Sequence, residues 1–292
     1  MTQLAITVNV YPRLPLELEL AIFEIAAGYK DTRCALLLVA KRVYEWIRPL
    51  LYVAFHFDSG IKVQSPHPAL RHLCAADPDT LPLHATRHFV LCDHTYELAR
   101  ILRACSRLTH LGFYYTSSNA FPDELRTAIS SLRSVRFLTA NNSTLERSGL
   151  TNPAHPLFAH VTHFSFASSG PRSEPSARMA RLICGMPALT HLALQPALPG
   201  ALRPLLCRET GCRRLRVLIL RPWNAHSGKQ AVGQVASVLQ DARVVVIWAT
   251  AWAEGSLPVP GNGESFWEAA DRFVRDKKRG LFDQHYYELA KP

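Results

Sequence analysis

The chain has 292 residues, of which 48% are hydrophobic and 19% charged, as in an ordinary folded protein with one large domain or two smaller ones. Its net charge is +10, and the excess lies in residues 61–243, which hold 21 basic and 10 acidic side chains; this favours an acidic protein partner or a nucleic-acid backbone, or else an arginine-rich solvated surface. No apolar run is as long as a membrane span, no signal peptide is recognisable, and the seven cysteines form no C-x-x-C pair, so we expect reduced cysteines in a cytoplasmic or nuclear protein without membrane contact.

The start of the chain is expected to form a short tail and three helices. Residues 1–12 alternate apolar with small or polar side chains, which predicts a strand or an unstructured tail. Residues 13–52 then carry apolar side chains three or four positions apart, and this spacing predicts three short helices. The first helix has an apolar stripe from Leu14 to Ile25, with Pro15 in its first turn. So few residues cannot bury this stripe among themselves, and the helices therefore need a partner surface.

Two short patterns stand in these helices: Leu14-Pro15-x-Glu17-Leu18-x-x-x-Ile22-Phe23 and, after a spacer, Leu38-Val39-x-Lys41-Arg42. With them, the segment resembles the F-box, in the form found at the start of many fungal F-box-like proteins. The resemblance implies that the helices dock a Skp-type adaptor, which joins a cullin-RING ubiquitin ligase, while the C-terminal part holds the protein to be ubiquitinated. The alternative is a helical cap whose apolar stripe covers the first repeat. By position, the resemblance assigns contact with the adaptor to Leu14, Pro15, Leu18, Ile22, Phe23, Leu38 and Val39.

Residues 53–250 repeat the template Leu-x-x-Leu-x-Leu, with any large apolar residue allowed, at intervals of 24 to 29 residues. A period in the twenties on this template is typical of leucine-rich repeats, each with one strand and one return segment. A single unit cannot bury its apolar face, so we expect an α/β leucine-rich-repeat horseshoe with a parallel sheet on the concave face and helices on the convex face. The first positions of the template are Leu108, Leu132, Val161, Leu189, Leu215 and Ala242. Further strands are expected at 52–57 and 85–90, and helices at 68–76, 96–105, 123–131, 177–184, 200–208 and 229–239.

The remaining segments are expected to be loops and a cap. Residues 141–156 and 168–175 lack helical periodicity, which predicts long loops that take part in recognition. The strand at 244–248 is apolar throughout, so both of its faces should be covered. Residues 251–292 are expected to form a C-terminal helical cap, because solenoids need covered ends and a helix beginning near Phe266 carries an apolar stripe.

Side chains between the apolar positions of the template are expected to point out of the concave face. At one such position His163 and His191 are expected in adjacent strands, whose backbones lie about 4.8 Å apart. Two imidazoles at this distance could sense pH or bind a metal, but no Cys, Asp or Glu shares the position, so no metal is expected. The aromatic and guanidinium side chains nearby are typical of protein interface anchors. Binding of the target is therefore predicted at His110, Tyr114, Arg136, His163, His191, Gln195, Arg221 and Trp248.

The chain carries no nucleophile elbow, phosphate-binding loop, zinc-protease motif or dinucleotide-binding motif. We therefore expect a non-enzymatic protein without a cofactor. The leading hypothesis is a substrate-receptor subunit of a cullin-RING (SCF-type) ubiquitin ligase, in which the F-box-like segment docks a Skp-type adaptor and the basic repeats bind an acidic target protein. The alternatives are a leucine-rich-repeat scaffold for protein interactions without a ligase role and, less favoured, a nucleic-acid-binding repeat protein.

Overall fold

The computed structural model divides the chain into two compact units, Met1–Leu51 and Tyr52–Pro292. Each unit is described by itself. The strand or tail predicted at 1–12 lies outside the described residues. The structure describes residues 14–57, 68–91, 97–113, 121–167, 177–194, 199–207, 209, 211–222, 232–233, 235–248, 265–282 and 288–289.

The first unit consists of the three predicted helices, α1 (Leu16–Ala27), α2 (Lys30–Leu36) and α3 (Lys41–Ile47). A 3-10 turn, Arg48–Tyr52, follows α3. The helices pack around a small core in which Ala27, Val43 and Ile47 are fully buried, each 2% exposed or less. This core leaves the apolar stripe of α1 outside it.

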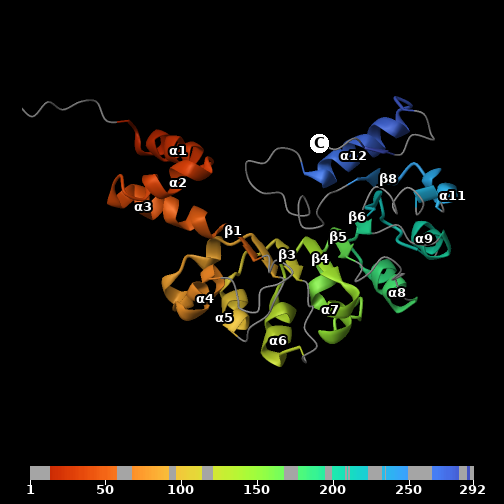
Figure 1. The fold of residues 1–292 in the computed structure, drawn as a ribbon, viewed down its shortest axis with the longest axis horizontal. Coiled ribbons are helices and arrows are strands. Elements are labelled where there is room, and N and C mark those ends of the chain that lie inside the picture. The colour runs from red at the N-terminus through yellow and green to blue at the C-terminus, as the bar shows by residue number, and fades with distance from the viewer. Residues whose placement is uncertain are drawn as a thin grey trace, which may run out of the picture. The chain divides into compact units, whose positions relative to one another are not determined.

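The second unit is a parallel sheet whose nine described strands follow one another in chain order. Figure 1 shows the helices α4 to α9 along the convex side of this sheet and α12 on the opposite, concave side. Strand–helix units stacked in this way confirm the predicted leucine-rich-repeat type of α/β fold. The strands are β1 (Ala54–Phe57), β2 (His88–Leu91), β3 (His110–Phe113), β4 (Phe137–Asn141), β5 (His163–Ala167), β6 (His191–Leu194), β7 (Val217–Leu220), β8 (Val244–Ile247) and β9 (Glu288–Leu289). The helices are α4 (Pro68–Ala75), α5 (Glu97–Ala104), α6 (Asp123–Ser131), α7 (Asn142–Arg147), α8 (Ala177–Gly185), α9 (Pro199–Leu206), α11 (Ala236–Leu239) and α12 (Phe266–Lys278).

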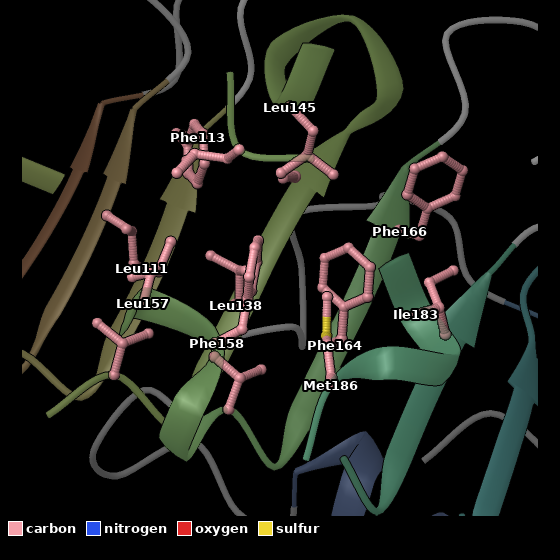
Figure 2. Close-up of a cluster of buried hydrophobic side chains, with 14 of the residues drawn as sticks. Leu111, Phe113, Leu138, Leu145, Leu157, Phe158, Phe164, Phe166, Ile183 and Met186 are labelled. Carbon is pink, nitrogen blue, oxygen red and sulfur yellow. The ribbon is translucent and has the colours of Figure 1, made fainter. Parts of the chain in front are cut away.

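The main core lies between the convex side of the sheet and the return segments. Figure 2 shows Leu111, Leu138 and Phe164 from adjacent strands, with Phe158 and Ile183 from the return segments packed against them. Burying each such side chain stabilises the fold by roughly 1.5–3 kcal/mol. In the sheet register, the core column runs through Phe89, Leu111, Leu138, Phe164, Leu192, Leu218 and Val244.

The predicted register is wrong in two strands. In β4 the template falls on Val135, Leu138 and Ala140 instead of starting at Leu132, because Phe137 pairs with its neighbours on the concave side. Ala140 is too small to stand out as a template position, whereas the larger Phe137 matches the template in the sequence.

In β8 the error is a single residue. Val244 pairs with Leu218, so Val244 and Val246 face the core while Val245 and Ile247 face the concave side. A uniformly apolar strand has no alternation from which its register can be read, and a one-residue slip exchanges the two faces. Both faces are buried, as predicted.

The long loop predicted at 141–156 is also wrong in part, because it contains the short helix α7. The Asn141 side chain caps this helix by accepting a hydrogen bond from the backbone N–H of Thr144 at 2.7 Å. A helix this short has too few turns to produce helical periodicity. The loop predicted at 168–175 lies outside the described residues.

Candidate interaction surfaces

The first unit presents an exposed apolar surface. Leu18 and Ile22 are 54% and 52% exposed and, with Ile25, follow one face of α1 at spacings of three or four residues; Leu14 and Tyr29, just before and just after the helix, are also exposed. Among the residues that the structure describes, none covers these side chains, and they form an exposed apolar patch.

The turn between α2 and α3 adds two more apolar side chains to the exposed set. Leu38 is 89% exposed and Val39 58%. Their backbone N–H groups donate to the carbonyls of Ala35 and Leu36 at 3.1 and 3.2 Å, which fixes the turn and directs both side chains outward. An ion pair between Arg42 and Glu19, at 2.5 Å, links α3 to α1.

Six of the seven residues assigned to the adaptor by resemblance are exposed, and the seventh differs. Phe23 is half-buried, its ring centroid lies 6.3 Å from that of Trp46, and it packs against the small core of the unit. The sequence did not single out Leu16 and Tyr29, which are 59% and 67% exposed. The exposed residues of the motif are Leu14, Pro15, Leu18, Ile22, Leu38 and Val39.

The concave face of the second unit carries a ladder of stacked rings. The register places His88, His110, Phe137, His163 and His191 side by side in five adjacent strands. Their ring centroids are 4.0, 4.0, 4.2 and 4.1 Å apart in succession, and neighbouring planes differ by 8° to 21°. The sequence predicted the His163–His191 neighbours but missed His88 and Phe137. The signal for His88 is its place before Phe89, which matches that of His110 before Leu111.

Threonines hold several of these rings in place. The hydroxyls of Thr109, Thr162 and Thr190 lie 2.9, 2.8 and 2.8 Å from Nδ1 of the histidine that follows each of them. Each hydroxyl also lies within hydrogen-bond distance of a carbonyl of the preceding strand, as Thr190 does of Thr162 at 3.1 Å. A hydroxyl has one hydrogen, so each threonine can donate to the carbonyl or to Nδ1 but not to both, and this choice is linked to the tautomer of the histidine.

Burial keeps the ladder neutral. It lowers the pKa of His88 to about 4 and, together with the neighbouring histidines, the pKa of His110 to about 3. It lowers the pKa of His163 to about 3 as well, with smaller contributions from His191 and Arg216. Burial also lowers the pKa of His191, against the opposing effect of Asp271. The stack is therefore uncharged at neutral pH.

Helix α12 covers the concave face over the later strands. Trp267 meets the rings of His163 and His191 edge-on, with centroids 5.1 and 6.1 Å apart. The guanidinium of Arg221 lies over the Phe266 ring at 4.8 Å. The C-terminal helix that was predicted as a cap therefore packs its apolar stripe onto the sheet, against Val217, Ile219, Val245 and Ile247.

The concave face is consequently not the open recognition surface that the sequence suggested. His110, His191 and Arg221 are 7%, 6% and 2% exposed. His163 is half-buried in the stack, and Trp248 packs against the core on the opposite side of the sheet, as the register correction in β8 requires. Of the predicted target-binding residues, Arg136 is exposed, while Tyr114 and Gln195 lie outside the described residues.

A cleft of about 710 Å³ opens between the segments that lead into β6 and β7. Two thiols lie on its wall, with 3.7 Å between Sγ of Cys184 and Sγ of Cys212. The Cys212 thiol donates to the Cys184 sulfur, which lowers the pKa of Cys184 and raises that of Cys212. Pro187, Arg213 and Arg214 also line the cleft.

No protein-family model matches this chain, and no curated protein is similar to it. Among the described residues, no three His, Cys, Asp or Glu side chains are arranged to hold a metal ion. No helix in the described part of the chain has the length and apolarity needed to cross a bilayer. The exposed apolar patch of the helical unit and the surfaces of the repeat unit are therefore the candidate interaction sites.

Proposed function

We propose that the protein is a non-enzymatic substrate-receptor subunit of a cullin-RING (SCF-type) ubiquitin ligase. In this proposal the helical unit docks a Skp-type adaptor and the repeat unit holds the target protein. The observation that carries the proposal is the exposure of Leu14, Leu18, Ile22, Leu38 and Val39, the apolar residues of the F-box-like motif.

The exposed motif residues are not needed for the core of their own unit. That core is formed by Ala27, Val43 and Ile47, with Phe23 and Trp46 packed beside them. Large apolar side chains kept outside an available core are typical of a surface that is buried in a complex.

The exposed area is sufficient for a useful affinity. Full burial of one large apolar side chain contributes roughly 1.5–3 kcal/mol, so the exposed half of each motif residue contributes about 1 kcal/mol or more. Truncating three of them should cost about 3 kcal/mol, which is a roughly hundredfold weaker complex.

Co-purification with a Skp-type adaptor tests the proposal. The variant Leu18→Ala/Ile22→Ala/Leu38→Ala should lose the adaptor while keeping its helical circular dichroism, because these residues lie outside the small core. The control is Leu281→Ala, a side chain that is 68% exposed and belongs to the repeat unit; this variant should keep the adaptor.

Equal recovery of the adaptor with wild type and the triple variant would rule out this docking surface. Absence of adaptor binding in every form would leave the second hypothesis, a leucine-rich-repeat scaffold for protein interactions without a ligase role.

A further inference from the structure

Exposed arginines gather where the strands of the sheet begin. In a parallel sheet every strand starts at the same edge, so the segments that lead into successive strands lie side by side. The backbone shows this directly, since the carbonyl of Thr109 accepts from Arg136 and Phe137 and the carbonyl of Thr190 accepts from Arg216 and Val217. We call this set the arginine edge: Arg107, Arg133, Arg136, Arg213, Arg214 and Arg216, all exposed.

The charges of the arginine edge are almost uncompensated. Arg216 lies 3.3 Å from Asp271, and in the described part of the chain no other member of the set is ion-paired with a carboxylate. Asp271 is itself shared with His191 at 3.4 Å and Arg275 at 3.6 Å. The set forms two groups, one before β3 and β4 and one before β7, and like charges with so few local counter-ions attract an anionic partner.

The cleft gives this edge a shaped site. Arg213 and Arg214 line it together with Met186, Pro187 and Leu189, and among the lining residues that the structure describes Glu209 is the one carboxylate. The two adjacent guanidinium groups suit a segment with acidic side chains, because a guanidinium group binds a carboxylate through two parallel hydrogen bonds. The apolar atoms beside them suit one large apolar side chain of the same segment.

Gly211 allows the cleft to form. A Cβ atom at this position would lie 2.2 Å from the carbonyl oxygen of Pro204 and 2.7 Å from that of Leu205. Only glycine permits so close an approach, which holds the segment carrying Arg213 and Arg214 firmly against the end of α9.

A protein segment fits this edge better than a nucleic acid. Single-stranded nucleic acids bind where exposed aromatic rings provide stacking platforms beside the basic groups. Among the residues between 52 and 248 whose burial the structure describes, no Phe, Tyr or Trp is exposed, and the ladder rings are buried or half-buried. Because the described ladder residues are buried or half-buried, the arginine edge is a more accessible charged surface than the concave face.

We propose that the arginine edge and its cleft bind an acidic segment of the protein held by the repeat unit, with Arg213 and Arg214 as the anchoring pair. The identity of the bound protein as a ubiquitination target rests on the proposed function. The binding of an acidic segment to the arginine edge does not depend on it.

The test is fluorescence polarisation of the full chain with a short labelled peptide of Glu and Asp residues around a central Leu. Arg213→Glu/Arg214→Glu should weaken binding about tenfold or more, and binding should weaken further as salt is raised. The matched control, Arg103→Glu/Arg181→Glu, changes the net charge equally at exposed positions on α5 and α8 and should weaken binding less than about twofold.

Three outcomes would overturn the inference. The first is absence of peptide binding to the wild type, and the second is equal weakening in both variants, which would show attraction to net charge alone. The third is tighter binding of an oligothymidine of the same charge that depends on Arg213 and Arg214, which would make the edge a nucleic-acid site.

Adaptor co-purification on the same preparations separates this inference from the proposed function. Adaptor binding without peptide binding would defeat the inference alone. Peptide binding that depends on Arg213 and Arg214, without adaptor binding, would defeat the proposed function alone.

Discussion

The neutral histidine ladder should make the protein sensitive to mild acid. Burial lowers the pKa of His88 to about 4 and the pKa values of His110 and His163 to about 3, whereas an unfolded histidine has a pKa of 6.5. Between pH 6.5 and these lower values the unfolded chain binds protons that the folded chain does not. The free energy of unfolding therefore falls as the pH is lowered through this window, and it levels off only below the folded pKa values.

The size of the effect follows from the shifts. One pKa unit corresponds to 1.36 kcal/mol, so each of the three histidines loses about 2 kcal/mol of stability between pH 7 and pH 5. Together they lose about 6 kcal/mol, which is comparable with the total stability of about 5–15 kcal/mol that domains have. Charged groups that face the ladder are Arg87 beside His88, Arg216 beside His163 and His191, and Asp271 beside His191. The attraction of Asp271 for a protonated His191 works against the loss at that end.

Urea denaturation of the full chain at pH 7, 6 and 5, followed by tryptophan fluorescence, measures the effect. Trp267 contacts the ladder and reports on its loss. The matched variant is His110→Phe, because Phe137 shows that a phenyl ring fits the same stack. The variant should lose about 2 kcal/mol less than wild type between pH 7 and pH 5. A stability that changes by less than about 1 kcal/mol over this range, or an unchanged pH dependence in His110→Phe, would refute the reasoning.

Three further predictions concern packing, capping and thiol reactivity. Phe164→Ala removes a fully buried ring from the core column and should lower the free energy of unfolding by about 3–5 kcal/mol in urea denaturation; a loss below about 1 kcal/mol would show that the column is not tightly packed. Ser265 accepts from the backbone N–H of Glu268 while the Glu268 carboxylate accepts from the N–H of Ser265, so Ser265→Ala should cost about 1 kcal/mol and speed hydrogen exchange in the first turn of α12, and unchanged exchange there would contradict the cap. Because the pKa of Cys184 is lowered and that of Cys212 raised, iodoacetamide followed by peptide mass spectrometry should modify Cys184 before Cys212, and faster labelling of Cys212 would contradict the hydrogen bond between the two thiols.

The sequence was informative where each local pattern leads to one structure. The recurrence of the template predicted the parallel repeat, because no single strand–helix unit can bury its own apolar face. Helical spacing predicted α5, α6 and α8 almost to the residue. The spacing of Leu14, Leu18 and Ile22 identified a stripe that is more than half exposed.

The rest depended on packing that local patterns do not encode. The register of β4 depends on Ala140, which is too small to stand out in the sequence. The register of β8 cannot be read from the sequence because the strand is apolar throughout and has no alternation of polar and apolar residues. The stripe on α12 shows that one face is buried but does not show against which surface, so its place over the concave ladder was not predicted. That placement also buries Arg221, which the sequence alone presented as an exposed anchor.

Hydrogen exchange of the full chain with and without a Skp-type adaptor tests the central claim most directly. The proposed function predicts slower exchange in residues 14–39, where α1 and the turn after α2 carry the exposed apolar side chains. Unchanged exchange in this segment at saturating adaptor, or slower exchange confined to the repeat unit, would contradict it.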